Sequence, residues 1–284
     1  MAGSTSRNAR GSVAYRDIRL KSTDRDRVYG LWDALSDYDV AEMDAAATCL
    51  LRRLCRWFGA DNAFWIGAIR VQKGASARHD AMSGWRAGAI HMLDSSRIDV
   101  RRQKEGLRAL NAGEGPGATS RALAARAGRF RLFTLQSGEL VDLTTFRKTS
   151  HYEWHYRKLG ICDRMWAVFP VNADAEAYYC FDKHGTRRRF TMRHMALAAH
   201  ALRGIKWFHR QLLLSHGLGV CKAALTPTER RALQELLSGK SERHVAERLG
   251  VTTGSAHQYA TSVYRKFGAR GRAEMMAMWL SRSI

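Results

Sequence analysis

The chain has 284 residues, 45% of them hydrophobic, and a formal net charge of +21. The length is enough for two domains, and the charge favours a polyanionic partner such as DNA. The sequence holds no apolar run long enough to span a membrane and no apolar segment near its start, so we expect a soluble, cytoplasmic protein with no membrane partner.

Most of the positive charge precedes residue 225. Residues 225–284 hold ten Lys/Arg against five Asp/Glu, which leaves +16 of the +21 in the first 224 residues. A solvated, arginine-rich surface is one interpretation, and extra contact with a DNA backbone is the other. The cysteines are odd in number and lack C-x-x-C spacing, which argues against a disulfide framework or a structural metal site. We therefore expect reduced thiols, no metal and no cofactor. The five are Cys49, Cys55, Cys162, Cys180 and Cys221.

The first two hundred residues alternate helical and extended patterns. Residues 1–22 are rich in Ser, Arg and Gly without periodicity, which predicts a disordered basic arm. Apolar residues recur at i, i+3, i+4 and i+7 from Val40 to Phe58, the clearest amphipathic helix of this part. A long amphipathic helix is predicted from Thr191 to about residue 214. Further helices are predicted at 23–36, 96–110, 119–127 and 150–159, and strands at 62–71, 85–93, 130–135, 163–170 and 177–182.

Helices packed on an antiparallel sheet are typical of an α+β sensor domain of the GAF or PAS type. Residues 150–195 carry W-H-Y in a helix, then L-G-I-x-D, a strand, a turn, a strand, and R-x-F-T before a helix. This segment resembles GAF-like sensor modules, closely over residues 150–215 and loosely over 40–93. We therefore predict a GAF-like sensor domain over residues 23–216 that ends in the long helix, followed by a linker at 217–224.

Aromatic residues in this domain have two interpretations, a ligand pocket and an ordinary core. In the pocket interpretation two histidines supply the polar contacts, and the small-molecule ligand is unknown. The phosphate-binding, zinc-hydrolase and serine-hydrolase motifs are all missing from the sequence, so we predict no enzymatic activity. The candidate pocket residues are Trp65, Trp85, His91, Trp154, His155 and Trp166.

Residues 225–284 carry start and stop signals for four short helices. Thr226, Pro227 and Glu229 form a capping box with proline at the first helical position. A fourth helix from about Gly271 is predicted to bury Ala273, Met276, Ala277 and Leu280. Two helices joined by a tight turn, the second longer and polar outside, indicate a helix-turn-helix, with any small helical bundle as the alternative. The other signals are N-caps at Ser241 and at Thr252 or Thr253, and stops at Gly239, Gly250 and Gly268.

The spacing of these signals resembles a known family. L-T-x-x-E at 225–229, G-x-S at 239–241, V-A-x-x-L at 245–249 and Y-R-K-F-G at 264–268 are similar to the LuxR/FixJ-type helix-turn-helix of bacterial regulators. The resemblance covers nearly all of residues 225–281 and implies a transcriptional regulator that binds double-stranded DNA through the helix near 252–267.

The resemblance also assigns roles to single residues. The base-facing positions fall on His257, Gln258 and Thr261. Many relatives carry Lys at the first and third of these, so the sequence preference of the family does not transfer. Gln258 can bond to adenine through two hydrogen bonds. Backbone contacts are predicted for Lys240, Arg243, Thr252, Thr253, Ser255, Arg265 and Lys266.

One recognition helix reads few base pairs, so we predict a homodimer. The predicted dimer surfaces are the fourth helix, through Met276 and Trp279, and the helix at 191–214. RNA polymerase is a candidate partner. The alternative function is a sigma-factor-like polymerase subunit, which would need an all-helical domain before the helix-turn-helix.

Overall fold

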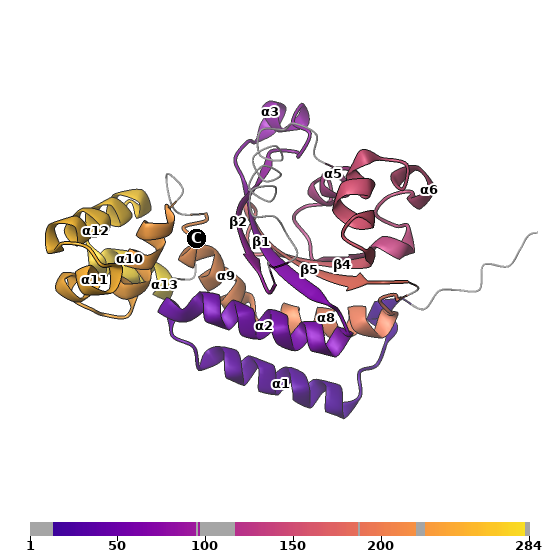
Figure 1. Cartoon of the computed structure of the whole chain (residues 1–284), viewed down its shortest axis with the longest axis horizontal. Helices are drawn as coiled ribbons and strands as arrows, with labels where there is room; N and C mark the ends of the chain where they lie inside the picture. Colours follow the sequence, from indigo (N-terminus) through magenta and orange to yellow (C-terminus); the bar gives the residue numbers. More distant parts are fainter. Residues whose placement is uncertain (1–13, 95, 97–116, 187, 220–224, 282–284) are drawn as a thin grey trace, which may run out of the picture.

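The computed structural model describes residues 14–94, 96, 117–186, 188–219 and 225–281. An N-terminal part of helices and an antiparallel sheet is followed by an all-helical C-terminal part (Figure 1). The N-terminal part has three layers, because helices cover both faces of an antiparallel sheet. None of the helices in the described ranges is long and apolar enough to cross a membrane. The predicted α+β class is confirmed at this level. The helix predicted at 96–110 lies outside the described residues, apart from Ser96.

The sheet has the strand order β2-β1-β5-β4-β3, and every neighbouring pair is antiparallel. All five predicted strands are present. Side chains alternate between the two faces, as strand geometry requires: on β1, Trp65 faces one helical layer while Phe64 and Ile66 face the other. The strands are β1 (Asn62–Arg70), β2 (Trp85–Met92), β3 (Arg131–Thr134), β4 (Ile161–Pro170) and β5 (Ala175–His184).

One face of the sheet is covered by α2 (Met43–Phe58), α8 (Met192–Arg203) and α9 (Lys206–Ser215), and α1 (Ser22–Ser36) packs on the outside of α2 and α8. The predicted stripe of α2 is buried, and Gly59 ends the helix in the left-handed conformation with φ 57°. This layer combines α1 and α2, which precede the strands in sequence, with α8 and α9, which follow them. The two ends of the N-terminal part therefore share one core.

The opposite face carries short helical segments around a second core that contains Trp85, Tyr156 and Trp166. The helix predicted at 150–159 is a single α-turn continued by a π-helix. A buried ion pair crosses the sheet here, with Arg131 Nη2 2.8 Å from Glu176 Oε2. The segments are α3 (Gly74–Arg78), α5 (Ala118–Ala124), α6 (Leu143–Phe146), α7 (Ser150–Tyr152) and η4 (Glu153–Arg157).

The prediction of one continuous helix over 191–214 is wrong, because the chain breaks between α8 and α9. Gly204 packs under Trp32, where a Cβ atom would lie 2.2 Å from the indole ring. Ile205 then leaves the helical conformation, with φ −115° and ψ 44°. The break lets α9 turn toward the C-terminal part.

The predicted disordered arm is wrong for residues 14–22. Tyr15–Asp17 forms the 3-10 turn η1, and Tyr15 and Leu20 pack against the first core. Ser22 is already part of α1. Residues 1–13 lie outside the described residues.

The C-terminal part contains α10 (Pro227–Leu237), α11 (Glu242–Leu249), α12 (Thr253–Phe267) and α13 (Arg272–Leu280). The predicted capping box is confirmed, since Thr226 Oγ1 accepts from the Glu229 N–H and the Glu229 carboxylate accepts from the Thr226 N–H. Ser241 and Thr252 cap the next two helices, and Gly250 and Gly268 end them at positive φ. Local signals therefore set the bounds of three of these helices.

Candidate nucleic-acid interface

Helix α12 has one buried face and one free face. Ala256, Ala260 and Val263 are fully buried against α10 and α11, at the spacing of one helix face. His257, Gln258 and Thr261 lie on the other side and are exposed. The fold therefore brings the three predicted base-facing residues together on one uncovered surface.

His257 is held by the neighbouring helix. Its Nδ1 lies 3.0 Å from Glu242 Oε2 in the first turn of α11. The two helices are joined by a short turn at Gly250–Thr252, and the Thr252 Oγ1 accepts from the Ser255 N–H at 3.1 Å. Thr252, Thr253 and Ser255 thus lie at the start of α12, where free backbone N–H groups and the helix dipole favour an anion.

Three of the predicted backbone contacts are exposed cations around this surface: Lys240, Arg243 and Arg265. Arg243 pairs with Glu247 at 3.4 Å, but its side chain is 85% exposed and free to exchange that partner for a phosphate. Arg272 Nη2 donates to the Lys240 main-chain carbonyl, which ties the start of α13 to the loop before α11. All three side chains are exposed cations, and their contact with a DNA backbone stays a prediction.

Lys266 is a correction to the sequence-based assignment. Its ammonium donates to Glu229 Oε2 at 2.6 Å, and only 17% of the side chain is exposed. Burial raises the pKa of Glu229, but hydrogen bonds from Lys266, the Thr226 backbone and the Ser262 hydroxyl outweigh it and hold this pKa at about 2. Lys266 therefore neutralises the carboxylate of the capping box and does not point at a phosphate.

The sequence of this part also matches a known family model. Residues 223–279 match the model described as "Bacterial regulatory proteins, luxR family". Residues 223–279 are a LuxR-family helix-turn-helix domain. The match begins just before the capping box and ends within α13, so it includes all three residues predicted to face the bases.

A search of the curated proteins finds no match to this chain. Among solved structures, the chain is similar to SdiA in complex with octanoyl-rac-glycerol, at 11% identity and TM-score 0.43 over 92% of this chain and 96% of that one. It is similar to the VqsR LBD domain from Pseudomonas aeruginosa at 13% identity and TM-score 0.43, over 68% of this chain and 98% of that one. Escherichia coli SdiA gives 10% identity and TM-score 0.39, over 89% and 95% of the two chains.

Helix α13 of the LuxR-type domain faces the opposite way from the prediction. Met275 and Trp279 are buried, and the Trp279 ring packs on Phe267 at a centroid distance of 5.6 Å. The assignment of Trp279 as an apolar residue left for a partner is therefore wrong. Three residues of the predicted inward stripe lie outside instead, Ala273, Ala277 and Leu280, of which Leu280 is 87% exposed, whereas Met276 is partly buried against the core.

The six predicted pocket residues do not line one cavity. Trp65 is buried in the first core, whereas Trp85 and Trp166 are buried in the second core across the sheet. Trp154 is 48% exposed, with the Lys158 ammonium over its ring, and His155 is also exposed on η4. His91 contacts Thr48 of α2 on the face of Trp65. The aromatic residues are therefore core and surface residues on three different parts of the domain.

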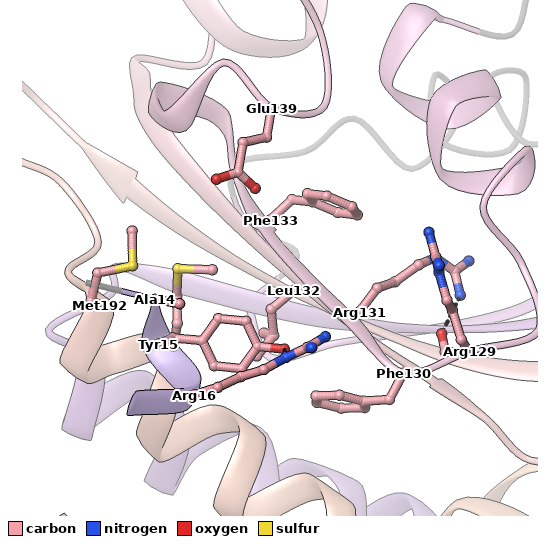
Figure 2. Close-up of a pocket in the computed structure, with 11 residues that line it drawn as sticks. Ala14, Tyr15, Arg16, Arg129, Phe130, Arg131, Leu132, Phe133, Glu139 and Met192 are labelled. Atoms are coloured by element: carbon pink, nitrogen blue, oxygen red, sulfur yellow. Dashed lines mark hydrogen bonds between the residues drawn. The ribbon is translucent and has the colours of Figure 1, made fainter. Parts of the chain in front are cut away.

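A cleft of about 490 Å³ lies elsewhere, along the free edge of β3 (Figure 2). Figure 2 shows Tyr15 and Arg16 on one side of the strand and Glu139 on the other. A second cleft, of about 400 Å³, opens beside α2 at Cys49 and Arg52. Neither of these clefts, both formed by described residues, is lined by a predicted pocket residue.

The four cysteines within the described ranges are free, as predicted. Burial raises the pKa of Cys55 to about 11 and that of Cys180 to about 12, so both remain protonated thiols.

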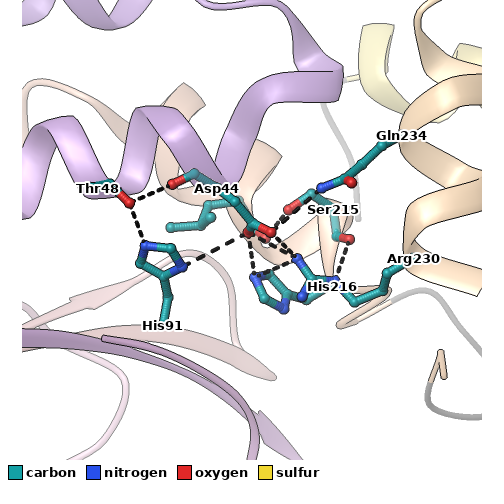
Figure 3. A network of polar contacts seen from close by, with 8 residues as sticks. Asp44, Thr48, His91, Ser215, His216, Arg230 and Gln234 are labelled. Carbon is teal, nitrogen blue, oxygen red and sulfur yellow. Dashed lines mark hydrogen bonds and ion pairs between the residues drawn. The ribbon is translucent and has the colours of Figure 1, made fainter. Parts of the chain in front are cut away.

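Sequence reasoning missed the residues that join the two parts of the chain. Asp44 on α2 accepts from Arg230 on α10, at 2.9 Å to each carboxylate oxygen (Figure 3). Arg210 on α9 donates to the Met278 carbonyl and, at 3.3 Å, to the Trp279 carbonyl at the end of α13. Leu214 of α9 is buried in the core of the LuxR-type domain. The hydrogen-bonded partners are 68 to 186 residues apart in sequence, and no local pattern marks them.

Proposed function

We propose that the protein is a transcriptional regulator that reads the major groove of DNA through α12. The observation that supports this most is the uncovered surface formed by His257, Gln258 and Thr261 within a LuxR-family domain. Gln258 offers both a donor and an acceptor to an adenine edge, and the Thr261 methyl group fits a thymine methyl. Lys240, Arg243 and Arg265, with the N-terminus of α12, contact the phosphates on either side.

The regulator acts as a homodimer in this proposal, and α13 provides the contact. Its outer face carries Ala273, Ala277 and Leu280 at i, i+4 and i+7, the pattern of a helix packed against another helix, and Met276 at its margin is partly buried. Met276 keeps the role predicted from the sequence, and Leu280 takes the role first assigned to Trp279. A two-fold pair would place two copies of α12 on half-sites about one helical turn apart.

The N-terminal part, which we place at residues 23–216 before a linker at 217–224, acts as a GAF/PAS-like sensor domain. Its three layers and its antiparallel order β2-β1-β5-β4-β3 support this architecture. Its contacts with α10 and α13 give it a route to influence the reading domain. The sigma-factor-like alternative required an all-helical domain here, and the sheet argues against it.

Binding to duplex DNA of mixed sequence tests the proposal. Fluorescence anisotropy at several salt concentrations should show that affinity falls as salt rises, because bound phosphates release counterions. The variant Arg243→Ala should reduce the slope of log K against log salt by about 0.9, and Arg157→Ala, on the N-terminal domain, serves as its matched control. Wild-type protein that shows no DNA binding at low salt would refute the proposal.

A further inference from the structure

Asp44 stands at the centre of a polar network between the two domains (Figure 3). It lies in the first turn of α2 and receives the Arg230 guanidinium on both of its carboxylate oxygens. Gln234 of α10 adds a longer hydrogen bond of 3.4 Å. The charged or titratable groups that face this carboxylate are His91 from β2, His216 after α9, and Arg230 from α10.

Hydrogen bonds fix the tautomer of His91. The Thr48 hydroxyl donates to the Asp44 main-chain carbonyl at 3.0 Å, so its oxygen accepts from His91 Nε2 at 2.8 Å. In the neutral ring the proton is then on Nε2. The bare Nδ1 lies 4.0 Å from Asp44 Oδ1, a position from which only a protonated ring is attracted to the carboxylate.

His216 faces the same two groups. Its Nε2 lies 3.2 Å from Arg230 Nη2, and because a guanidinium can only donate, this contact is a hydrogen bond only while Nε2 carries no proton. The same Nε2 lies 3.5 Å from Asp44 Oδ1. A proton on Nε2 would therefore oppose the Arg230 donor and turn His216 into a donor to Asp44.

We propose that this network is a proton-sensitive latch, in which protonation of His91 and His216 frees Arg230 and undocks the helix-turn-helix from the N-terminal domain. Both histidines belong to the N-terminal part. Their protonation therefore replaces the Arg230–Asp44 ion pair, which joins the two domains, with pairs between the histidines and Asp44 inside one domain. The network then holds three cations and one carboxylate in place of one cation and one carboxylate.

The direction of the pH response follows from the burial of the two rings. Burial lowers the pKa of both His91 and His216 in the docked state, and the Arg230 charge lowers them further, against an opposing effect of Asp44. The undocked state binds protons more readily, so docking is favoured above the ordinary histidine pKa of about 6.5 and weakens as pH falls below it. Two fully linked histidines lower the docking constant by up to about 100-fold between pH 7.5 and 5.5.

Hydrogen exchange of the full chain measures docking directly. Protection of α10 is expressed relative to β5 in the same molecule, which cancels the effect of pH on intrinsic exchange. We expect this ratio to fall about 10- to 100-fold from pH 7.5 to 5.5 in the wild type. The Asp44→Asn variant should show a low ratio already at pH 7.5, whereas Asp174→Asn, which removes an exposed ion pair with Lys73, should behave as the wild type.

The double variant His91→Gln His216→Gln should keep a high ratio at both pH values, and His79→Gln, an exposed histidine on the same domain, is its control. If the double variant fails to fold, His91→Gln alone provides the test. The logarithm of its protection ratio should then change with pH by about half as much as in the wild type. A wild-type ratio that is flat with pH, or one that falls equally in the glutamine variants, would overturn the latch. This readout needs no DNA, so it separates the latch from the proposed function.

Discussion

Replacing Lys266 by Ala distinguishes a structural lysine from a DNA-contacting one. The substitution removes the ammonium that contacts the Glu229 carboxylate, whose residue is 5% exposed. The pKa of Glu229 is lowered from its ordinary value of 4.5 to about 2, and a tenfold change in proton affinity corresponds to about 1.4 kcal/mol. Hydrogen bonds from Thr226 and Ser262 share that total with Lys266, so we expect a loss of about 2–3 kcal/mol in the free energy of unfolding.

The pH profile of stability provides a second readout of the same contact. Because the folded pKa of Glu229 is lowered to about 2, its contribution is complete above about 4.5 and is lost as pH falls from 4.5 to 2. Urea unfolding followed by circular dichroism should show this acid-dependent loss in the wild type. Lys266→Ala should reduce the loss in that window.

Arg265→Ala is the matched control, one position earlier on the exposed side of α12. It should leave stability within about 0.5 kcal/mol and reduce the salt slope of DNA binding by about 0.9. Lys266→Ala should do the reverse, with lower stability and an unchanged slope. The reasoning is refuted if Lys266→Ala keeps wild-type stability and lowers the salt slope.

Three further outcomes follow from buried and exposed side chains. Trp279→Ala should destabilise the C-terminal domain by about 3–5 kcal/mol in urea unfolding, because it empties a core position. Leu280→Glu should leave that stability unchanged and convert a dimer to a monomer in light scattering; a dimer that persists would exclude α13 as the contact. Arg131→Met should lower the free energy of unfolding by about 3–5 kcal/mol, because Glu176, which is 0% exposed, keeps its charge without a cation. An unchanged urea midpoint would show that Glu176 takes up a proton at little cost.

The sequence predicted those parts of the fold that depend on neighbouring residues. Thr226 and Glu229 are three positions apart, and their mutual hydrogen bonds form wherever the helix begins. The strand patterns were also local, since two covered faces favour a run of apolar residues such as the one at residues 177–181 in β5.

Errors arose where the local pattern was ambiguous. Helix α13 is apolar on nearly all sides, so periodicity could not decide which residues it buries; the structure buries the larger Met275 and Trp279 and leaves Ala273 and Leu280 outside. The helix predicted from Thr191 to about residue 214 ran through Gly204, but α8 ends there, where Trp32, far away in sequence, packs against the glycine.

The residues of the functional surface also differ in how far the sequence could predict them. Helical spacing placed His257, Gln258 and Thr261 on the outer side of their helix, and the resemblance to the LuxR/FixJ-type domain assigned them to the bases. Lys266 could not be assigned from the sequence, because its partner Glu229 is 37 residues away on α10. Asp44 and Arg230 are 186 residues apart, so their contact exists only in the folded chain.

Selection of bound duplexes from a random DNA pool tests the central claim most directly. We expect the full chain to enrich one motif in two inverted copies about one helical turn apart, and Gln258→Ala to lose about 1–3 kcal/mol on that motif while its affinity for random DNA is unchanged. A selected pool that stays random, or a motif that Gln258→Ala binds as tightly as the wild type, would contradict sequence reading through α12.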